Sequence, residues 1–258
     1  MKFQVWWALA RAVILESIRR KDLWVVAILG FLIMLSAGAL GFFGLNGLEA
    51  FAKDLAATVL GLFSTIIGIL TASRLMPEEI KNRTLYPLIA RPISRLDLLI
   101  GKLVGAICVT WISFLILAGL TAISLAMFHV HFEPVMAQFV LCKVLGLSIV
   151  CAVSLSLSLF MTPAAAATMS FILAFGSSML TRAFTMAYDF SPPAMQGLFK
   201  VMNAALPQYG LFDLGSRAAN AHWGPVPLWV VGTLFAYALV YSAAMVTLGW
   251  VKFRKQAV

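Results

Sequence analysis

Two histidines near the middle of the chain are the residues whose type and spacing first suggest chemistry. His129 and His131 are separated by one residue, and Glu133 follows two positions later. On an extended segment, side chains at alternate positions lie on the same side, so the two imidazoles could share a metal ion. Two ligands on a short loop are weak evidence for such a site. We therefore predict no metal site and keep His129 and His131 only as weak candidates.

Two glycine-containing segments resemble catalytic or phosphate-binding motifs, but each lacks an essential residue. Gly-Ser-Ser-Met at 176–179 lacks the second glycine of a Gly-x-Ser-x-Gly nucleophile motif. Gly-Lys at 101–102 resembles the end of a phosphate loop, but Leu96 replaces the upstream glycine and Leu103 replaces the Ser or Thr. We predict no catalytic residue in this chain, which we do not expect to be an enzyme.

The composition identifies the environment that must position any functional side chain. The 258 residues are 62% hydrophobic and 11% charged, whereas soluble domains carry about 45–50% apolar and about 25% charged residues. So few charges cannot cover a water-facing surface, and so many apolar residues exclude a disordered chain. Three scattered cysteines form no disulfide framework and match no zinc spacing. Because the apolar stretches are continuous, we predict an all-α polytopic membrane protein with a single transmembrane domain.

Six segments are long and apolar enough to cross a bilayer, which takes about 20 residues. They are residues 23–45, 55–73, 98–127, 135–161, 164–181 and 226–251. The break between the fourth and fifth segments is only Thr162-Pro163.

Lysine and arginine predict the orientation of these spans, because cytoplasmic loops retain them. Of the 19 basic residues, 14 lie before the first span, around the second connection or after the last span. We therefore predict that both termini are cytoplasmic. The protein is predicted to lie in the bacterial cytoplasmic (inner) membrane. This sorting, together with attraction to anionic membrane lipids, accounts for the net charge of +9 without any nucleic-acid partner.

Residues 2–20 are predicted to form an amphipathic helix in the cytoplasmic interface, with its tryptophans at headgroup depth. The predicted anchor residues are Trp6, Trp7, Arg11, Arg19 and Arg20. The pattern fits a plain membrane anchor and a role in coupling or partner contact equally well.

The cytoplasmic connection, residues 76–97, contains signals for a rigid elbow. Pro77 followed by two acidic residues predicts a helix start, since both suit the first helical turn. Pro87 and Pro92 would end this short helix, and Ser94-Arg95-Leu96-Asp97 reads as a capping box that begins the third span. Charges that alternate with leucine and isoleucine favour a docking surface for a soluble partner over an ordinary loop.

The external stretch, residues 183–225, is longer than a plain helix connection and too apolar for a free loop. We predict two short interfacial or re-entrant helices that form either an outer gate or a lid sealing a dimer. The gate candidates are Leu198, Met202, Pro207 and Phe212.

Two further features concern the inside of the spans. Lys143 is the one basic residue that could lie well within a span, where it is either functional or, as we prefer, snorkels to the outer headgroups. Gly101 and Gly105 are spaced to let another helix approach closely.

The run from Glu78 to Lys102 resembles the cytoplasmic loop of permease subunits of the ABC type-2 class. The matching elements are the acidic pair, Arg-Thr-Leu at 83–85, a leucine-rich piece, Pro-x-Ser-Arg at 92–95 and Gly-Lys at 101–102. Within that class the run is most similar to the branch that contains the nitrous-oxide-reductase maturation permease. The sequence departs from many relatives at 82–83, where it has Asn-Arg in place of Arg-Gly.

The resemblance implies a transmembrane subunit that pairs with a second permease copy or a paralogue and docks two ABC ATPase subunits. ATP and Mg²⁺ would be bound by the ATPase partner. The implied coupling interface comprises Glu78, Glu79, Arg83, Thr84, Leu85, Arg91, Pro92, Ser94 and Arg95. A periplasmic or accessory protein is a further partner that the resemblance allows.

The sequence therefore predicts the permease subunit of an ATP-driven ABC transporter, and an exporter in particular. The alternative is an ion-coupled secondary transporter or another multi-span protein without an ATPase. Coupling to an ion gradient would require Asp or Glu within the spans. All ten acidic residues lie in loops or at helix ends, which argues against this alternative. The substrate, and the choice between transport and mechanical signalling, stay open.

Overall fold

The computed structural model describes residues 2–20, 28, 30–31, 48–81, 94–127, 134–190, 192–219 and 224–255. All regular structure in these ranges is helical. Five helices are long and apolar enough to cross a membrane. They are α3 (Leu48–Lys81), α5 (Arg95–Met127), α6 (Pro134–Ser158), α7 (Pro163–Phe190) and α10 (Leu228–Lys255). The first predicted span, residues 23–45, lies almost entirely outside the described residues.

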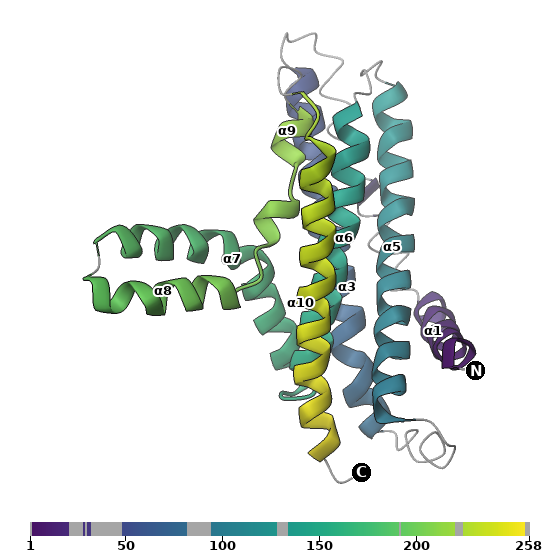
Figure 1. Cartoon of the computed structure of the whole chain (residues 1–258). Helices are drawn as coiled ribbons and strands as arrows, with labels where there is room; N and C mark the ends of the chain where they lie inside the picture. Colours follow the sequence, from purple (N-terminus) through teal and green to yellow (C-terminus); the bar gives the residue numbers. More distant parts are fainter. Residues whose placement is uncertain are drawn as a thin grey trace.

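Four of these helices, α3, α5, α6 and α10, stand side by side in one bundle (Figure 1). At one end α3, α6 and α10 finish while α5 and α7 begin; we call this end, which carries the C-terminus, the proximal end. The opposite end is the distal end. The N-terminal helix α1 (Lys2–Arg19) crosses α5 near the proximal end instead of joining the bundle (Figure 1).

Helix α6 is the centre of the bundle and packs on α3, α5, α7 and α10. Fourteen of its residues are buried, and small side chains such as Ala152 and Ser154 let the neighbouring helices come close. The predicted break after α6 is confirmed, because α7 begins at Pro163 and the Ala166 N–H donates to the Thr162 carbonyl at 2.8 Å.

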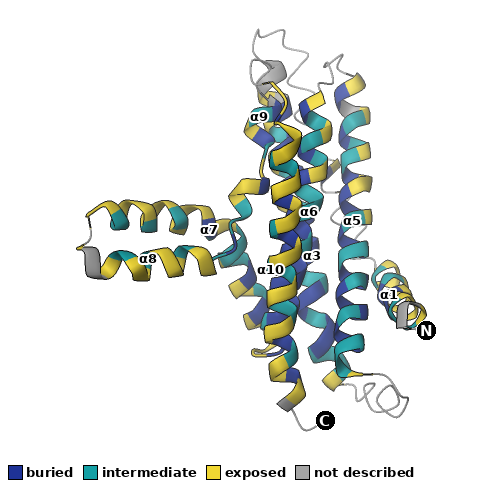
Figure 2. Cartoon of the chain, viewed as in Figure 1, coloured by how far each residue is buried: buried dark blue, intermediate teal, exposed yellow. Residues whose placement is uncertain are grey.

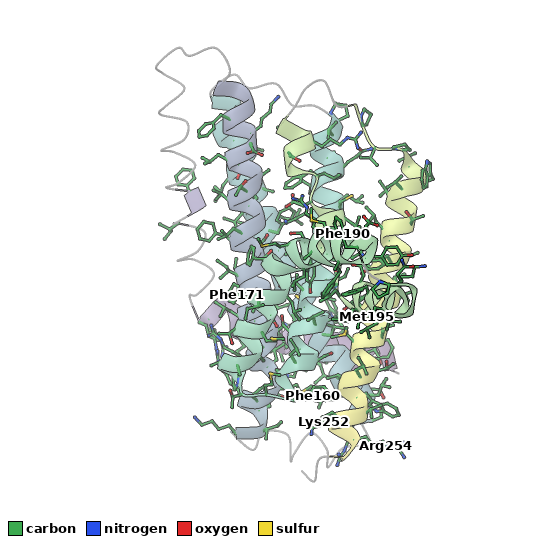
Figure 3. The ribbon with its side chains drawn as sticks, turned by 90° about the vertical axis from the view of Figure 1, so that its left-hand side faces the viewer. Phe160, Phe171, Phe190, Met195, Lys252 and Arg254 are labelled. Carbon is green, nitrogen blue, oxygen red and sulfur yellow. The ribbon has the colours of Figure 1, made fainter. Side chains whose placement is uncertain are left out.

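The second half of α7 leaves the bundle and pairs with α8 (Pro193–Ala205) in a projecting arm (Figure 1). Figure 2 shows that the outer surface of this arm is exposed. Figure 3 labels two residues of the arm, Phe190 and Met195, and both are exposed. The arm contains the first part of the predicted external stretch, because helix α7 continues past residue 181. The reason is that no glycine or proline interrupts 182–190, and Pro192 then disfavours helix in the residue before it.

Two short helices return the chain from the arm to the distal end: the 3₁₀ helix η1 (Tyr209–Phe212) and α9 (Gly215–Ala219). Helix α10 then runs back to the proximal end and is tied to α6 through its own backbone. The Gln138 side-chain amide donates to the Val226 carbonyl at 2.9 Å and accepts from the Val226 N–H at 2.7 Å. Lower down, the Ser156 hydroxyl donates to the Met245 carbonyl at 2.6 Å.

The prediction that a new helix begins at Pro77 is wrong. Helix α3 runs through Pro77 and ends at Lys81. A proline inside a helix removes one backbone hydrogen bond, but only four residues follow it here. That last turn carries Glu78 and Glu79, which are ion-paired to side chains of other elements, so tertiary contacts offset the lost bond.

Candidate functional site

A buried ion pair joins the end of α3 to the first third of α5. The Lys102 ammonium pairs with the Glu79 carboxylate, and the side chains are 4% and 18% exposed. Glu79 comes near the end of α3 and Lys102 lies two turns into α5, so the pair spans the undescribed residues 82–93. A charge pair that is buried in this way holds the two helices at a fixed separation, because leaving either partner alone is costly.

The neighbouring residue, Glu78, ties α3 to the residue that follows α1. The Arg20 guanidinium donates to both carboxylate oxygens of Glu78 and also lies 3.2 Å from Glu16. These side chains are between 32% and 49% exposed. The bidentate geometry fixes where α1 ends relative to α3, although exposed pairs contribute only about 0–1 kcal/mol to stability.

The start of α5 is capped as predicted. The Asp97 N–H donates to the Ser94 hydroxyl at 3.1 Å, and the Ser94 hydroxyl donates in turn to the Asp97 carboxylate. The same carboxylate accepts a hydrogen bond from the Trp6 indole N–H at 2.9 Å. The capping box therefore also fixes α1, whose Trp6 is 91 positions away in the sequence.

Arg95 connects the start of α5 to the end of α10. Its guanidinium donates to the carbonyls of Phe253 and Arg254 at 3.0 and 3.3 Å and lies 5.7 Å above the fully buried Phe253 ring. Arginine suits this position because the last carbonyls of a helix lack intrahelical partners and carry partial negative charge. Arg254 itself stacks on Trp250, and Lys252 lies above Phe160 at the same end of the bundle (Figure 3).

Helix α1 packs directly onto the two predicted small positions of α5. A Cβ at Gly101 would lie 2.7 Å from Leu9 Cδ1, and a Cβ at Gly105 would lie 2.7 Å from Val13 Cβ. The prediction of close approach at these glycines is confirmed. Leu9, Ala10 and Val13 are buried in this contact, so the inner face of α1 is covered by protein.

These contacts make one unit at the proximal end, which we call the proximal interlock. It joins α1, α3, α5 and α10 on either side of residues 82–93 and consists of Trp6, Arg20, Glu78, Glu79, Ser94, Arg95, Asp97 and Lys102. Its members include both backbone caps and ion pairs, so a displacement of the connection would move several helices together.

The family comparison decides what kind of membrane protein carries this unit. Residues 17–191, more than half of the chain, match the model of the ABC-2 family transporter protein. The chain belongs to the ABC-2 transporter family. It is a membrane permease subunit, and the family implies an ABC ATPase partner that uses the nucleotide. No curated protein matches the chain.

Four of the predicted coupling residues of this ABC-2 permease, Glu78, Glu79, Ser94 and Arg95, belong to the proximal interlock. The other five, Arg83, Thr84, Leu85, Arg91 and Pro92, lie outside the described residues. All four described residues make contacts within the chain itself. Glu79 in particular is engaged with Lys102, whereas Ile80 and Lys81 beside it are exposed.

The predicted interfacial anchors separate into two groups. Trp6 and Arg20 contact other helices of the permease. Trp7 is 55% exposed, and Arg11 and Arg19 are exposed as well. The difference follows from helical spacing, since position 6 shares a face with the buried Leu9, Ala10 and Val13 and position 7 does not.

The sequence did not lead us to include Lys102 or Asp97 among the predicted coupling residues. Lys102 had a signal, because a lysine within the apolar run of α5 requires a carboxylate partner. Asp97 was predicted only as a cap, and nothing in the sequence pairs it with Trp6.

The predicted gate residues do not form one group. Leu198 and Met202 lie on the exposed arm, whereas Phe212 is 1% exposed and packs in the bundle core against Gly146. Pro207 lies between the arm and η1. His129 and His131 lie outside the described residues, and the ranges that the structure does describe contain no group of three His, Cys, Asp or Glu side chains suited to a metal.

Replacing Trp6 by phenylalanine tests the link between α1 and the α5 cap. The substitution removes the indole N–H that Asp97 accepts, and hydrogen bonds to charged groups contribute about 1.5–3 kcal/mol. We expect the melting temperature of the purified permease to fall clearly for Trp6→Phe. Trp7→Phe, on the exposed face, is the matched control and should leave it nearly unchanged; equal effects of the two variants would contradict the assignment.

Proposed function

We propose that this permease is the transmembrane subunit of an exporter in which a separate ATPase docks on the proximal end. Closure of the ATPase pair around ATP and Mg²⁺ would push on residues 82–93, and the push would drive substrate movement or a conformational signal across the membrane. The single observation that carries this proposal is the proximal interlock, which ties four helices together around that connection.

The interlock suits the transmission of force because both sides of the connection are fixed. Glu79 and Lys102 hold α3 to α5, and Arg95 holds α5 to the end of α10. A push on the connection would therefore move α3, α5 and α10 together. A loose loop would absorb the same displacement.

The proposed orientation places the proximal end and both termini in the cytoplasm of a bacterial inner membrane. It is supported by the 14 basic residues that lie before 23–45, in the 74–102 connection and in the last turn of α10. Residues 23–45 would supply a sixth span, with α1 at the cytoplasmic interface. The exposed apolar residues of the arm, such as Phe190 and Met186, favour a dimer with a second copy or a paralogue.

Within the family, Pro-x-Ser-Arg at 92–95 and Gly-Lys at 101–102 support a place near the nitrous-oxide-reductase maturation branch. An accessory or periplasmic partner at the distal end would be consistent with that placement.

Co-purification with an ABC ATPase encoded beside this permease tests the docking surface. Lys81 is exposed at the end of α3 and is not part of the interlock, so Lys81→Glu changes the docking charge without breaking an ion pair that holds the helices. We expect roughly a tenfold weaker ATPase affinity, which corresponds to about 1.4 kcal/mol.

Lys200→Glu on α8 is the matched control, because Lys200 is also exposed but lies on the arm. It should leave the permease-to-ATPase ratio unchanged. Complete assembly and transport in the absence of any ATPase would overturn the proposal and favour an ion-coupled transporter.

A further inference from the structure

A cavity of about 420 Å³ lies in the distal half of the bundle, away from the proximal interlock. Side chains of α3, α6, α7, η1 and α9 line it. Its volume is within the range of sites that hold small molecules or lipid headgroups, about 300–1,000 Å³. Neither the docking of an ATPase nor the coupling contacts make use of it.

Lys143 places a positive charge in this cavity. It lies nine residues from the distal start of α6, about 14 Å along the helix axis, and its side chain is 15% exposed. A Cβ on Gly61 of α3 would lie 2.8 Å from the Lys143 Nζ, so the glycine makes room for the ammonium. Lys143 therefore points into the bundle instead of snorkelling to the outer headgroups.

The ammonium is only loosely paired. Within the described part of the chain its ion-pair partner is Asp213, with Nζ and Oδ2 3.7 Å apart. A charge-assisted hydrogen bond measures about 2.7–2.9 Å, and an ammonium has three N–H donors. Asp213 is held in place by the Gly215 N–H, which donates to Oδ1 at 3.1 Å. Lys143 thus has donor capacity left for a second anionic group in the cavity.

The cavity also presents negative charge and neutral polar groups. Asp54 and Asp213 both line it and are both exposed. Tyr209 lines it as well, and burial raises the pKa of this phenol well above its ordinary value, so it stays an uncharged hydrogen-bonding group. An anion alone would meet the two carboxylates, and a cation alone would meet Lys143. A group that carries both charges satisfies both.

One part of the remaining wall is apolar and open to the surroundings. Leu62 of α3 and Phe175 of α7 line it while being 39% and 50% exposed. Both belong to membrane-spanning helices, so this side of the cavity faces apolar surroundings. A charged interior beside an apolar opening fits an amphiphile, with its headgroup inside and its chain passing the opening.

We propose that this cavity binds the headgroup of a zwitterionic phospholipid of the phosphatidylethanolamine class. Its phosphate would accept hydrogen bonds from Lys143, its ammonium would lie against Asp213 and Asp54, and its acyl chain would leave past Leu62 and Phe175. The site is formed by one copy of the permease and requires no ATPase, so it goes beyond the proposed function and can be tested separately from it.

The test is native mass spectrometry of the full permease in detergent with added amphiphiles of equal chain length. The probes are a lysophosphatidylethanolamine, a lysophosphatidylglycerol and an alkylammonium, with phosphoethanolamine as the probe without a chain. We expect the zwitterionic lipid to bind at least about tenfold more tightly than each of the others, a difference of about 1.4 kcal/mol.

Two pairs of variants localise the binding. Lys143→Gln should weaken binding of the zwitterionic lipid about tenfold, whereas Lys200→Gln on the arm should not change it. Gly61→Ala would place a methyl group against the flexible end of Lys143, so the fold should persist while binding weakens. Gly176→Ala, where a Cβ meets no atom of the described residues within 4 Å, is its control.

The proposal is overturned if Lys143→Gln and Gly61→Ala both retain the lipid at the wild-type level. It is also overturned if the anionic lipid binds as tightly as the zwitterionic one. If phosphoethanolamine bound more tightly than the acylated lipid, the lipid proposal would be wrong. The cavity would then be a site for a water-soluble zwitterion. Loss of ATPase docking with lipid binding intact would contradict the proposed function alone.

Discussion

Glu79→Gln is expected to destabilise the permease by about 3 kcal/mol, measured by equilibrium unfolding in mixed micelles. Lys102 is 4% exposed, and removal of one partner from a buried ion pair typically costs about 3–5 kcal/mol because the other charge stays buried. The lower end applies here, since Glu79 itself retains 18% exposure and the glutamine amide can still accept a hydrogen bond. In the assembled transporter we also expect weaker coupling, because α3 and α5 would no longer be held together.

The adjacent glutamate supplies the control. Glu78→Gln breaks an exposed pair with Arg20 and should cost less than about 1 kcal/mol. The double variant Glu79→Gln, Lys102→Met removes both buried charges and should be more stable than Glu79→Gln alone. If the double variant were the less stable of the two, the buried charge on Lys102 would not be the cause of the loss.

Gly105→Ala is expected to displace α1 from α5. The added Cβ would lie 2.7 Å from Val13 Cβ and 3.1 Å from the Ala10 Cα. Both neighbours are at or next to the α1 backbone, so they cannot turn aside as a flexible side-chain end would. Overpacking of this kind costs about 1–3 kcal/mol. Trypsin should then cleave after Arg11 several times faster than in the unaltered permease, because the helix that protects this bond is released.

Gly119 lies on the same helix and provides the comparison. A Cβ there meets no atom of the described residues within 4 Å, so Gly119→Ala should be neutral or stabilise α5 by up to about 1 kcal/mol. Identical cleavage rates for Gly105→Ala and Gly119→Ala would mean that the α1 contact does not depend on the glycine.

Local signals predicted the parts of this permease that depend on neighbours in the sequence. The Ser94–Asp97 cap is a four-residue motif whose hydrogen bond lies within one helical turn. This hydrogen bond could therefore be predicted without knowledge of the tertiary structure. The helix break at Pro163 and the close approach at Gly101 and Gly105 also follow from residue type and spacing. Span positions depend on composition alone, which explains why five of the six predicted segments lie within observed apolar helices or differ from them by a few residues.

Pairings between distant residues could not be predicted in the same way. Trp6 and Asp97 are 91 positions apart, and Glu79 and Lys102 are 23 apart. The first pairing depends on where α1 crosses α5 and the second on how α3 packs against α5, and both are properties of the packed helices. The continuation of α3 through Pro77 has the same origin, because contacts from Arg20 and Lys102 hold a turn that the local sequence would end.

Helix α10 is held in the bundle partly by side chains of other helices that bind its backbone. The Gln138, Ser156 and Arg95 side chains bind backbone atoms at Val226, Met245 and Phe253, from its distal approach to its proximal end. Only a small share of its apolar stretch is buried, and the buried side chains Leu234, Ala238 and Phe253 add the packing contacts of α10 itself. Its position along the bundle thus depends partly on side chains of α5 and α6, and the exposed positions of α10 are freer to vary during evolution than its buried ones.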